Sequence, residues 1–144
     1  MKIIHQMSLK GPWGYRWKSP VSAIEQMGGP VEGQIKVPAL WCDCFGHQVG
    51  VSVWSRRFQK PTNLDSNERV MIATMELEGV KGLSLNGRPL PLNDQPETGF
   101  RFDITEALEP SNLLEIDIEC ETEAQTDSRG MTEPAVIEIW SLTE

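Results

Sequence analysis

Residues 100–119, FRFDITEALEPSNLLEIDIE, constrain the fold more than any other part of the chain. Apolar and polar residues alternate over 100–104 and again over 114–120, which is the pattern of two strands with one buried face each. Between them we expect one helical turn, with Thr105 as its N-cap and Pro110 preventing its continuation. The segment is therefore predicted to be a corner that joins two neighbouring strands.

The same period of two recurs along most of the chain. Apolar residues on both parities of 68–77 predict a central strand, and Asn86-Gly87 predicts a type I′ hairpin turn because both residues tolerate a positive φ. We count about eight or nine strands, no long helix and no internal repeat. The expected fold is a single all-β domain over residues 1–144, built of two antiparallel sheets packed face to face.

The charge of the chain argues against a nucleic-acid partner. The formal net charge is −8 and the isoelectric point is about 4.8, and the longest basic cluster is Arg56-Arg57 with Lys60 nearby. Phosphate binding depends on clustered cations, which this sequence lacks. No run of about 20 apolar residues is present, so no membrane span is expected, and residues 1–13 lack the apolar region of a signal peptide. A cytoplasmic location is the expectation.

Several segments occur in the order found in a known family. They are VSVWSRRF (51–58), ERVMIATMELEGVKGLSLNGRPL (68–90) and FRFDITEALEPSNLLEIDI (100–118), preceded by IKVPALW (35–41). Together they resemble the N-terminal sugar-binding domain of family-two glycoside hydrolases, the group of the β-galactosidases and β-glucuronidases. The resemblance runs from about Val31 to Glu119, and Ser55 stands where the family has a tyrosine.

This resemblance implies a galactose-binding-like jelly roll, in agreement with the strand pattern. The catalytic glutamates of these enzymes lie in a separate barrel domain that has no counterpart in this sequence, so the resemblance implies accessory contact with carbohydrate and not hydrolysis. The sequence also gives little support for nucleophilic catalysis, since it has only two histidines and no G-x-S-x-G motif. We expect a non-catalytic binding module that needs no cofactor.

Four residues that stand out in the matched segments have a simpler structural explanation. Asn86 and Gly87 suit the turn, Thr105 suits a cap, and Asp103 can accept hydrogen bonds from nearby backbone amides. Turn chemistry accounts for every one of these residue types, so we assign them to the fold and not to a binding site.

A metal hypothesis can be built only from Cys42, Cys44, His47 and Cys120. Zinc takes thiolates and imidazoles in a tetrahedron, and the C-x-C-x-x-H segment falls in a predicted loop. However, zinc ligands are usually spaced C-x₂₋₄-C, and Cys120 lies in a strand where it is expected to pack as a small apolar residue. The expectation is no bound metal, with a metal-dependent site at Cys42, Cys44 and His47 as the weakest alternative.

Aromatic residues matter most for carbohydrate, because a flat ring stacks on the apolar face of a pyranose. Of the five tryptophans, Trp54 and Trp140 fall in apolar strands and are predicted to fill the core. The remaining aromatics and their polar neighbours give the candidate ligand surface: Trp17, Trp41, His47 and Arg57. The alternative is that these rings only close the open ends of the sandwich.

Two functions therefore compete at the level of the sequence. The first is a binding module whose partner is a carbohydrate. The second is an interaction or assembly module that uses an apolar sheet face for self-association or for a protein partner.

Overall fold

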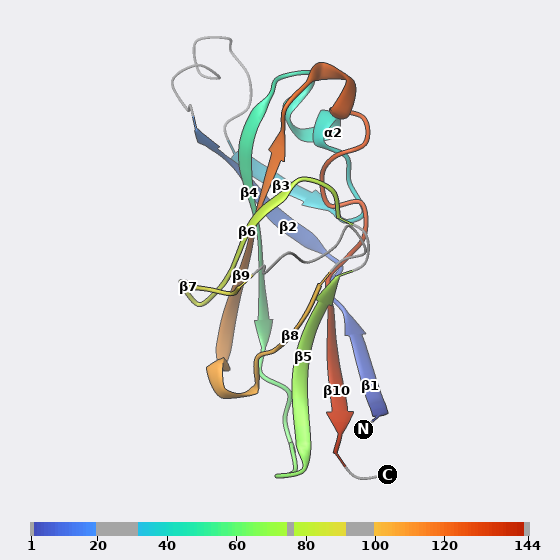
Figure 1. The fold of residues 1–144 in the computed structure, drawn as a ribbon, viewed down its shortest axis with the longest axis vertical. Helices are drawn as coiled ribbons and strands as arrows, with labels where there is room; N and C mark the ends of the chain where they lie inside the picture. The colour runs from blue at the N-terminus through green and yellow to red at the C-terminus, as the bar shows by residue number, and fades with distance from the viewer. Residues whose placement is uncertain (1, 20–31, 75–76, 92–99, 143–144) are drawn as a thin grey trace.

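The computed structural model of the chain describes residues 2–19, 32–74, 77–91 and 100–142. These residues form two antiparallel sheets packed face to face as a jelly-roll sandwich, so the predicted fold class is confirmed (Figure 1). The four-stranded sheet has the order β1 (Lys2–Ser8), β10 (Val136–Ser141), β5 (Glu68–Thr74) and β8 (Phe100–Asp103). The six-stranded sheet has the order β3 (Glu32–Lys36), β2 (Pro12–Ser19), β4 (Gly50–Gln59), β9 (Ser111–Cys120), β6 (Val80–Leu85) and β7 (Arg88–Pro89).

Helical structure in the described ranges is short. It consists of the α-helix α2 (Trp41–Phe45) and the 3₁₀ turns η1 (Thr105–Ala107) and η2 (Glu123–Gln125). The segment with Cys42 and Cys44, predicted to be a loop, is therefore a helix. None of these helices is long and apolar enough to cross a membrane. Residues 19–30, whose Pro- and Gly-rich sequence predicts a long loop, lie almost entirely outside the described residues.

The core lies between the sheets and follows the predicted alternation. On β9, Leu114, Ile116 and Ile118 are fully buried and Asn112 and Cys120 share their parity, whereas the residues between them are half-buried on the other face. Trp54 on β4 lies beside Ile116 in the same sheet, and Ile72 on β5 belongs to the opposite sheet of the same core cluster. Each such side chain contributes about 1.5–3 kcal/mol by leaving water, so the alternation of β9 directly selects which face packs inward.

One residue predicted to fill the core does not. Trp140 lies opposite Arg69 on the outward parity of β10 and is only half-buried, because Val70 and Ile139 occupy the inward parity at this level. On the neighbouring edge strand β1, His5 lies opposite Ile139 on the inward parity and is nevertheless exposed. An edge strand has too little sheet above it to bury either face.

The corner predicted at residues 104–110 carries the chain from one sheet to the other. β8 belongs to the four-stranded sheet and β9 to the six-stranded sheet, so the two strands are consecutive in sequence but not paired. Thr105 is not the N-cap, which is Ile104. Instead, Thr105 Oγ1 accepts a hydrogen bond from the Val70 amide at 2.8 Å, and its hydroxyl donates to Asp103 Oδ1 at 2.7 Å. This fixes the corner to β5.

A pair of asparagines, Asn112 buried and Asn86 half-buried, fixes the other side of the corner. The Asn86 amide nitrogen donates to Asn112 Oδ1 at 3.0 Å, and Asn86 Oδ1 accepts from the Leu113 amide at 2.8 Å. Asn112 is fully buried and bonds to both the N–H and the C=O of Glu109, at 2.9 and 2.8 Å. Asn86 and Gly87 have φ values of 54° and 82°, so the predicted turn is confirmed and Asn86 has a second role in the corner.

The polar segment after β9 packs along α2. The amides of Trp41 and Cys42 donate to the carbonyls of Arg129 and Thr126 at 2.7 and 2.8 Å. Gly130 has a φ of +115°, and a Cβ there would lie 2.6 Å from the Trp41 nitrogen. Only glycine allows this approach, so this loop is anchored to α2 by its backbone.

We expect Asn112→Ala to destabilise the fold by about 2–4 kcal/mol, because it leaves several buried backbone and amide groups without a hydrogen-bond partner. Urea unfolding monitored by tryptophan fluorescence measures the loss. Gln34→Ala, which removes an exposed amide from β3, is the matched control and should change stability by less than about 0.5 kcal/mol. Equal effects of the two substitutions would contradict the structural role of Asn112.

Candidate functional site

The two tryptophans of the predicted ligand surface are core residues. Trp17 is 4% exposed and Trp41 is fully buried, with their ring centroids 5.7 Å apart and both rings in contact with Phe45. The Trp41 indole nitrogen donates to the Gln48 carbonyl at 2.7 Å. Neither ring offers a face to a ligand in this arrangement, which matches the alternative that these rings close one end of the sandwich.

The two polar residues of that surface are exposed but far apart. His47 precedes β4, and its Nδ1 lies 3.1 Å from Thr126 Oγ1. Arg57 is exposed on the outward parity of β4, seven residues beyond Gly50, which corresponds to roughly 23 Å along a strand. Ligand contact by His47 or Arg57 stays a prediction, but the structure does not place the four residues around one site.

The cysteines and His47 do not form a metal centre. Within the described ranges, no three His, Cys, Asp or Glu side chains are grouped so that they could hold a metal ion. Burial, together with the charges of Asp43 and Cys42, raises the pKa of the Cys44 thiol to about 12. Burial also raises the pKa of Cys120, whose thiol donates to the Thr122 carbonyl at 3.4 Å.

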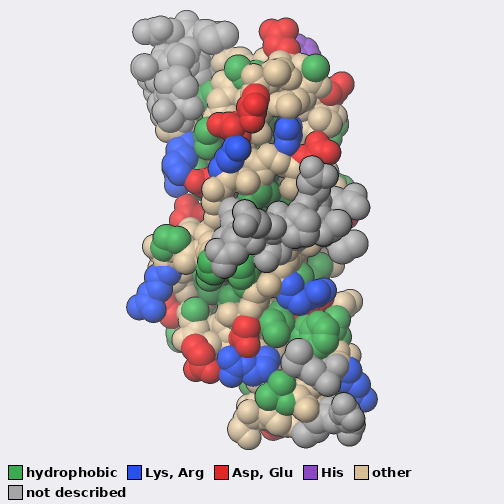
Figure 2. All heavy atoms as spheres, viewed as in Figure 1, with side chains coloured by type: hydrophobic (Ala, Val, Ile, Leu, Met, Phe, Trp, Pro, Cys, Tyr) green, Lys and Arg blue, Asp and Glu red, His purple; other side chains and the backbone are tan. Residues whose placement is uncertain are grey.

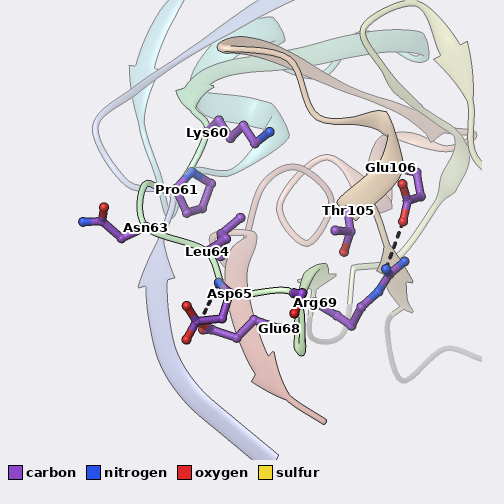
Figure 3. Close-up of a pocket in the computed structure, with 10 residues that line it drawn as sticks. Lys60, Pro61, Asn63, Leu64, Asp65, Glu68, Arg69, Thr105 and Glu106 are labelled. Atoms are coloured by element: carbon purple, nitrogen blue, oxygen red, sulfur yellow. Dashed lines mark hydrogen bonds and ion pairs between the residues drawn. The ribbon is translucent and has the colours of Figure 1, made fainter.

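A groove of about 470 Å³ lies at one end of the sandwich, within the size range of small-molecule sites. The β4–β5 connection forms one side of it and the start of η1 forms the other (Figure 3). Its lining residues are polar or charged with two exceptions: Lys60, Pro61, Asn63, Leu64, Asp65, Ser66, Glu68, Arg69, Thr105 and Glu106. We call this site the groove.

Ion pairs and backbone bonds hold part of the groove in place. Arg69 Nε donates to Asp103 Oδ2 at 2.8 Å and its Nη1 donates to Glu106 Oε1 at 2.9 Å (Figure 3). Burial raises the pKa of Asp103, but hydrogen bonds from Arg69 and Thr105 and the charge of Arg69 outweigh it, so the pKa lies below its usual value. Glu68 Oε1 accepts from the Asp65 amide at 3.0 Å, which closes the loop on the opposite side.

Other polar groups of the groove have no such partner within the part of the chain that the structure describes. The Lys60 ammonium, the Asn63 amide and the Ser66 hydroxyl line the groove, and no side-chain hydrogen bond occupies them. Leu64 is half-buried and packs on the hydrophobic core from the same loop. The groove thus combines the apolar side chains of Pro61 and Leu64 with donors and acceptors that are available to a ligand.

A second surface lies on the outward side of the four-stranded sheet. Its apolar members do not pack on the core, although they sit on strands that do: Ile3, Met71, Ala73, Val136 and Trp140. Figure 2 shows hydrophobic side chains beside basic ones over the lower part of this view, where β5, β8 and β10 lie. We call this surface the outer sheet face.

One carboxylate is buried within the outer sheet face. Glu138 is 4% exposed and accepts hydrogen bonds from Arg101 Nε at 2.7 Å, Arg101 Nη2 at 3.2 Å and Trp140 Nε1 at 3.0 Å. The Arg101 guanidinium also lies 5.6 Å from the centroid of the Trp140 ring. Burial raises the pKa of Glu138, but the bonds from Arg101 and Trp140 outweigh it, so the pKa lies below its usual value.

The fold is shared with parts of several solved glycoside hydrolases. A *Ruminococcus gnavus* β-glucuronidase in complex with uronic isofagomine matches with a TM-score of 0.70 and 15% identity over 94% of this chain. A Faecalibacterium prausnitzii β-glucuronidase matches with a TM-score of 0.69 and 17% identity over 97% of this chain. A rhamnosidase from Novosphingobium sp. PP1Y matches with a TM-score of 0.64 and 14% identity over 97% of this chain. The chain has the fold of one part of these enzymes. The resemblance seen in the sequence is thereby confirmed at the level of the fold.

The match covers only a fraction of each enzyme. This chain spans 28% of the *R. gnavus* protein, 32% of the *F. prausnitzii* protein and 16% of the rhamnosidase. No family model and no curated protein matches the sequence. The shared part is therefore a domain-sized β-sandwich, and the activities of the whole enzymes do not follow from it.

The burial of the thiols predicts their reactivity. At pH 8 we expect a disulfide reagent such as Ellman's to label Cys42 first, because it is the only partly exposed cysteine, while Cys44 and Cys120 react only on unfolding. Counting released thiolate in native and denatured protein checks this. If added zinc protects Cys42 from labelling and raises the melting temperature, the result would instead support a metal site at Cys42.

The Glu138 pair predicts a pH-dependent stability. With its pKa lowered in the folded state, ionised Glu138 stabilises the fold above pH of about 4 and that contribution is lost as the pH falls through the folded pKa. In Arg101→Met, Glu138 stays buried but loses its cationic partner, so ionised Glu138 destabilises the fold at pH 7. Because half of the Arg101 side chain is exposed, we expect a loss of about 1–2 kcal/mol at pH 7 that shrinks below pH of about 4.

Thermal unfolding at pH 3 and pH 7 measures this difference. Arg88→Met removes an exposed arginine that has no ion pair in the described ranges, and it is the matched control. If the melting temperatures of wild type and Arg101→Met differ by the same amount at both pH values, the stabilising role of the Arg101–Glu138 pair is contradicted.

Proposed function

We propose that this chain is a non-catalytic carbohydrate-binding module and that the groove is its ligand site. The observation that carries the proposal is the combination of free hydrogen-bonding groups with the apolar side chains of Pro61 and Leu64 in a groove of about 470 Å³. The fold shared with sugar-processing enzymes supports it, as does the small share of those enzymes that the chain covers.

The groove can contact both parts of a sugar ring. A pyranose has an apolar face of C–H groups and a rim of hydroxyls that both donate and accept. Leu64 and Pro61 supply apolar surface, and Asn63 and Lys60, which also line the groove, carry donors for hydroxyl oxygens. Glu106, held by Arg69, supplies a carboxylate acceptor in a fixed position (Figure 3). The site is therefore assembled from groups that recognise hydroxyls.

The charge of the groove favours a neutral sugar over a uronate. Two cationic side chains, Lys60 and Arg69, and three anionic ones, Asp65, Glu68 and Glu106, line it. Arg69 is already paired with two carboxylates, which leaves Lys60 as the cation available to a ligand. A sugar carboxylate would meet more negative than positive charge there, whereas hydroxyls are not repelled.

The affinity is expected to be low, because no aromatic ring is among the described residues that line the groove. Stacking on Trp17 and Trp41, which the sequence suggested, is replaced by contact with aliphatic side chains. A dissociation constant near 1 mM, about −4 kcal/mol, is the expected range. Titration of ¹⁵N-labelled protein with galactose, glucose, rhamnose and glucuronate, followed by NMR shifts, measures binding at this strength.

We expect neutral sugars to shift resonances of residues 60–69 and 105–106, and glucuronate to shift them less. Lys60→Ala and Asn63→Gly should each weaken binding about three- to tenfold. Glycine is chosen at position 63 because Asn63 has a φ of 60°, which alanine would strain. His47→Ala and Arg57→Ala test the surface predicted from sequence, and loss of binding in these variants alone would reject the groove.

A further inference from the structure

The turn between β6 and β7 contains a chemically labile pair of residues. Of the five asparagines in the sequence, only Asn86 precedes a glycine, and every other one precedes a larger residue. An asparagine before glycine can react with the backbone, because the glycine amide carries no side chain that hinders its approach to the asparagine carbonyl carbon. Asn86-Gly87 is therefore a candidate site of spontaneous modification.

The reaction of this pair is a deamidation that consumes one water molecule and releases one ammonia molecule. The Gly87 amide nitrogen loses its proton and bonds to Asn86 Cγ, the bond from Cγ to Nδ2 breaks, and Nδ2 leaves as ammonia. Water then opens the resulting succinimide ring. Cleavage between Cγ and the ring nitrogen gives aspartate, and cleavage between the backbone carbonyl carbon and the ring nitrogen gives isoaspartate. No oxidant or cofactor is required.

The corner restrains both ends of the Asn86 side-chain amide. Nδ2 donates to Asn112 Oδ1 at 3.0 Å and to the Ala107 carbonyl at 3.4 Å. Oδ1 accepts from the Leu113 amide at 2.8 Å. Attack on Cγ makes the planar amide tetrahedral and removes Nδ2, so these bonds have to break before the reaction can proceed. The folded corner therefore opposes deamidation.

An aspartate at position 86 does not fit the same network. Its carboxylate keeps an acceptor for the Leu113 amide, but its second oxygen faces the oxygens of Asn112 and Ala107. Asn112 cannot turn its amide over to donate instead, because its Oδ1 accepts from the Glu109 N–H at 2.9 Å and its Nδ2 donates to the Glu109 carbonyl at 2.8 Å. Acceptors that face each other beside a buried side chain lose their hydrogen bonds, which destabilises the fold.

We propose that Asn86-Gly87 is a latent deamidation site that the corner keeps closed, and that deamidation prevents the corner from forming again. Isoaspartate also lengthens the backbone of the two-residue turn between Leu85 and Arg88, which disrupts the pairing of β6 with β7. Local opening of a folded protein is ordinarily reversible. Here the reaction makes it permanent, so the modified fraction records how often the corner has opened. The inference does not depend on carbohydrate binding in the groove.

Peptide mapping by mass spectrometry after incubation at pH 8 tests the proposal, with digestion at acidic pH to prevent deamidation during handling. We expect Asn86 to deamidate at least about tenfold more slowly in folded protein than in guanidinium chloride, because the corner first has to break its hydrogen bonds. Asn63 and Asn67 are internal controls that should change little in either condition, since leucine and glutamate follow them. Equal rates at Asn86 in folded and denatured protein would overturn the proposal.

Two variants separate protection by the corner from protection by overall stability. Asn112→Ala removes an acceptor of the Asn86 amide and should speed its deamidation in folded protein about threefold or more. Phe45→Leu weakens the core at α2, at the opposite end of β9 from Asn112 (Figure 1), and should have a smaller effect once denaturant equalises the unfolding free energies of the two variants. Equal acceleration would reject a specific role of the corner. If Asn112→Ala does not fold, the comparison of folded and denatured wild type still decides whether the site is closed.

The stability of the product is tested with Asn86→Asp. Asn63→Asp is the matched control, because Asn63 is exposed and has a φ of 60°, close to the 54° of Asn86. We expect Asn86→Asp to lower the melting temperature at pH 7 clearly more than Asn63→Asp, since only position 86 faces acceptors that need an amide donor. Equal melting temperatures would show that the corner tolerates the product, and the proposal would be wrong.

Discussion

The change of sheet between β8 and β9 is the constraint on which the rest of the structure depends. In this corner the chain leaves one sheet and enters the other within a few residues, so its backbone groups cannot all find partners in a β-ladder. Thr105 and Asp103 satisfy them on the side of β5, and Asn86 and Asn112 satisfy them on the side of β9. These short polar side chains replace the missing ladder, and the two sheets are thereby fixed relative to each other.

The groove is built beside this corner. Arg69, on the outward parity of β5, bonds to Asp103 at the end of β8 and to Glu106 in η1. It therefore borders the outer sheet face with one bond and the groove with the other. The arrangement places the groove at one end of the sandwich, directly beside the corner.

The fold was largely predictable from the sequence, but the candidate site was not. Alternation on β9 and the Asn86-Gly87 turn depend on neighbouring residues, and both predictions were confirmed. The tryptophans were a less reliable guide, because alternation gives the parity of a ring but not which parity faces the core: Trp17 and Trp41 are buried, and Trp140 is half-exposed. The groove had no signal in the sequence, since it arises where residues 60–69 meet Thr105 and Glu106.

What the sequence by itself determined is the secondary structure and the two-layered class, because a period of two and turn-forming residues act through local backbone geometry. The tertiary structure alone decided which residues are available for binding. Whether Glu138 lies in water or beneath Arg101, and whether Asn112 is exposed or enclosed by Asn86 and Glu109, depends on strands distant in the chain. Burial and hydrogen bonding between such strands are set by the register and stacking of the sheets, which no local pattern specifies.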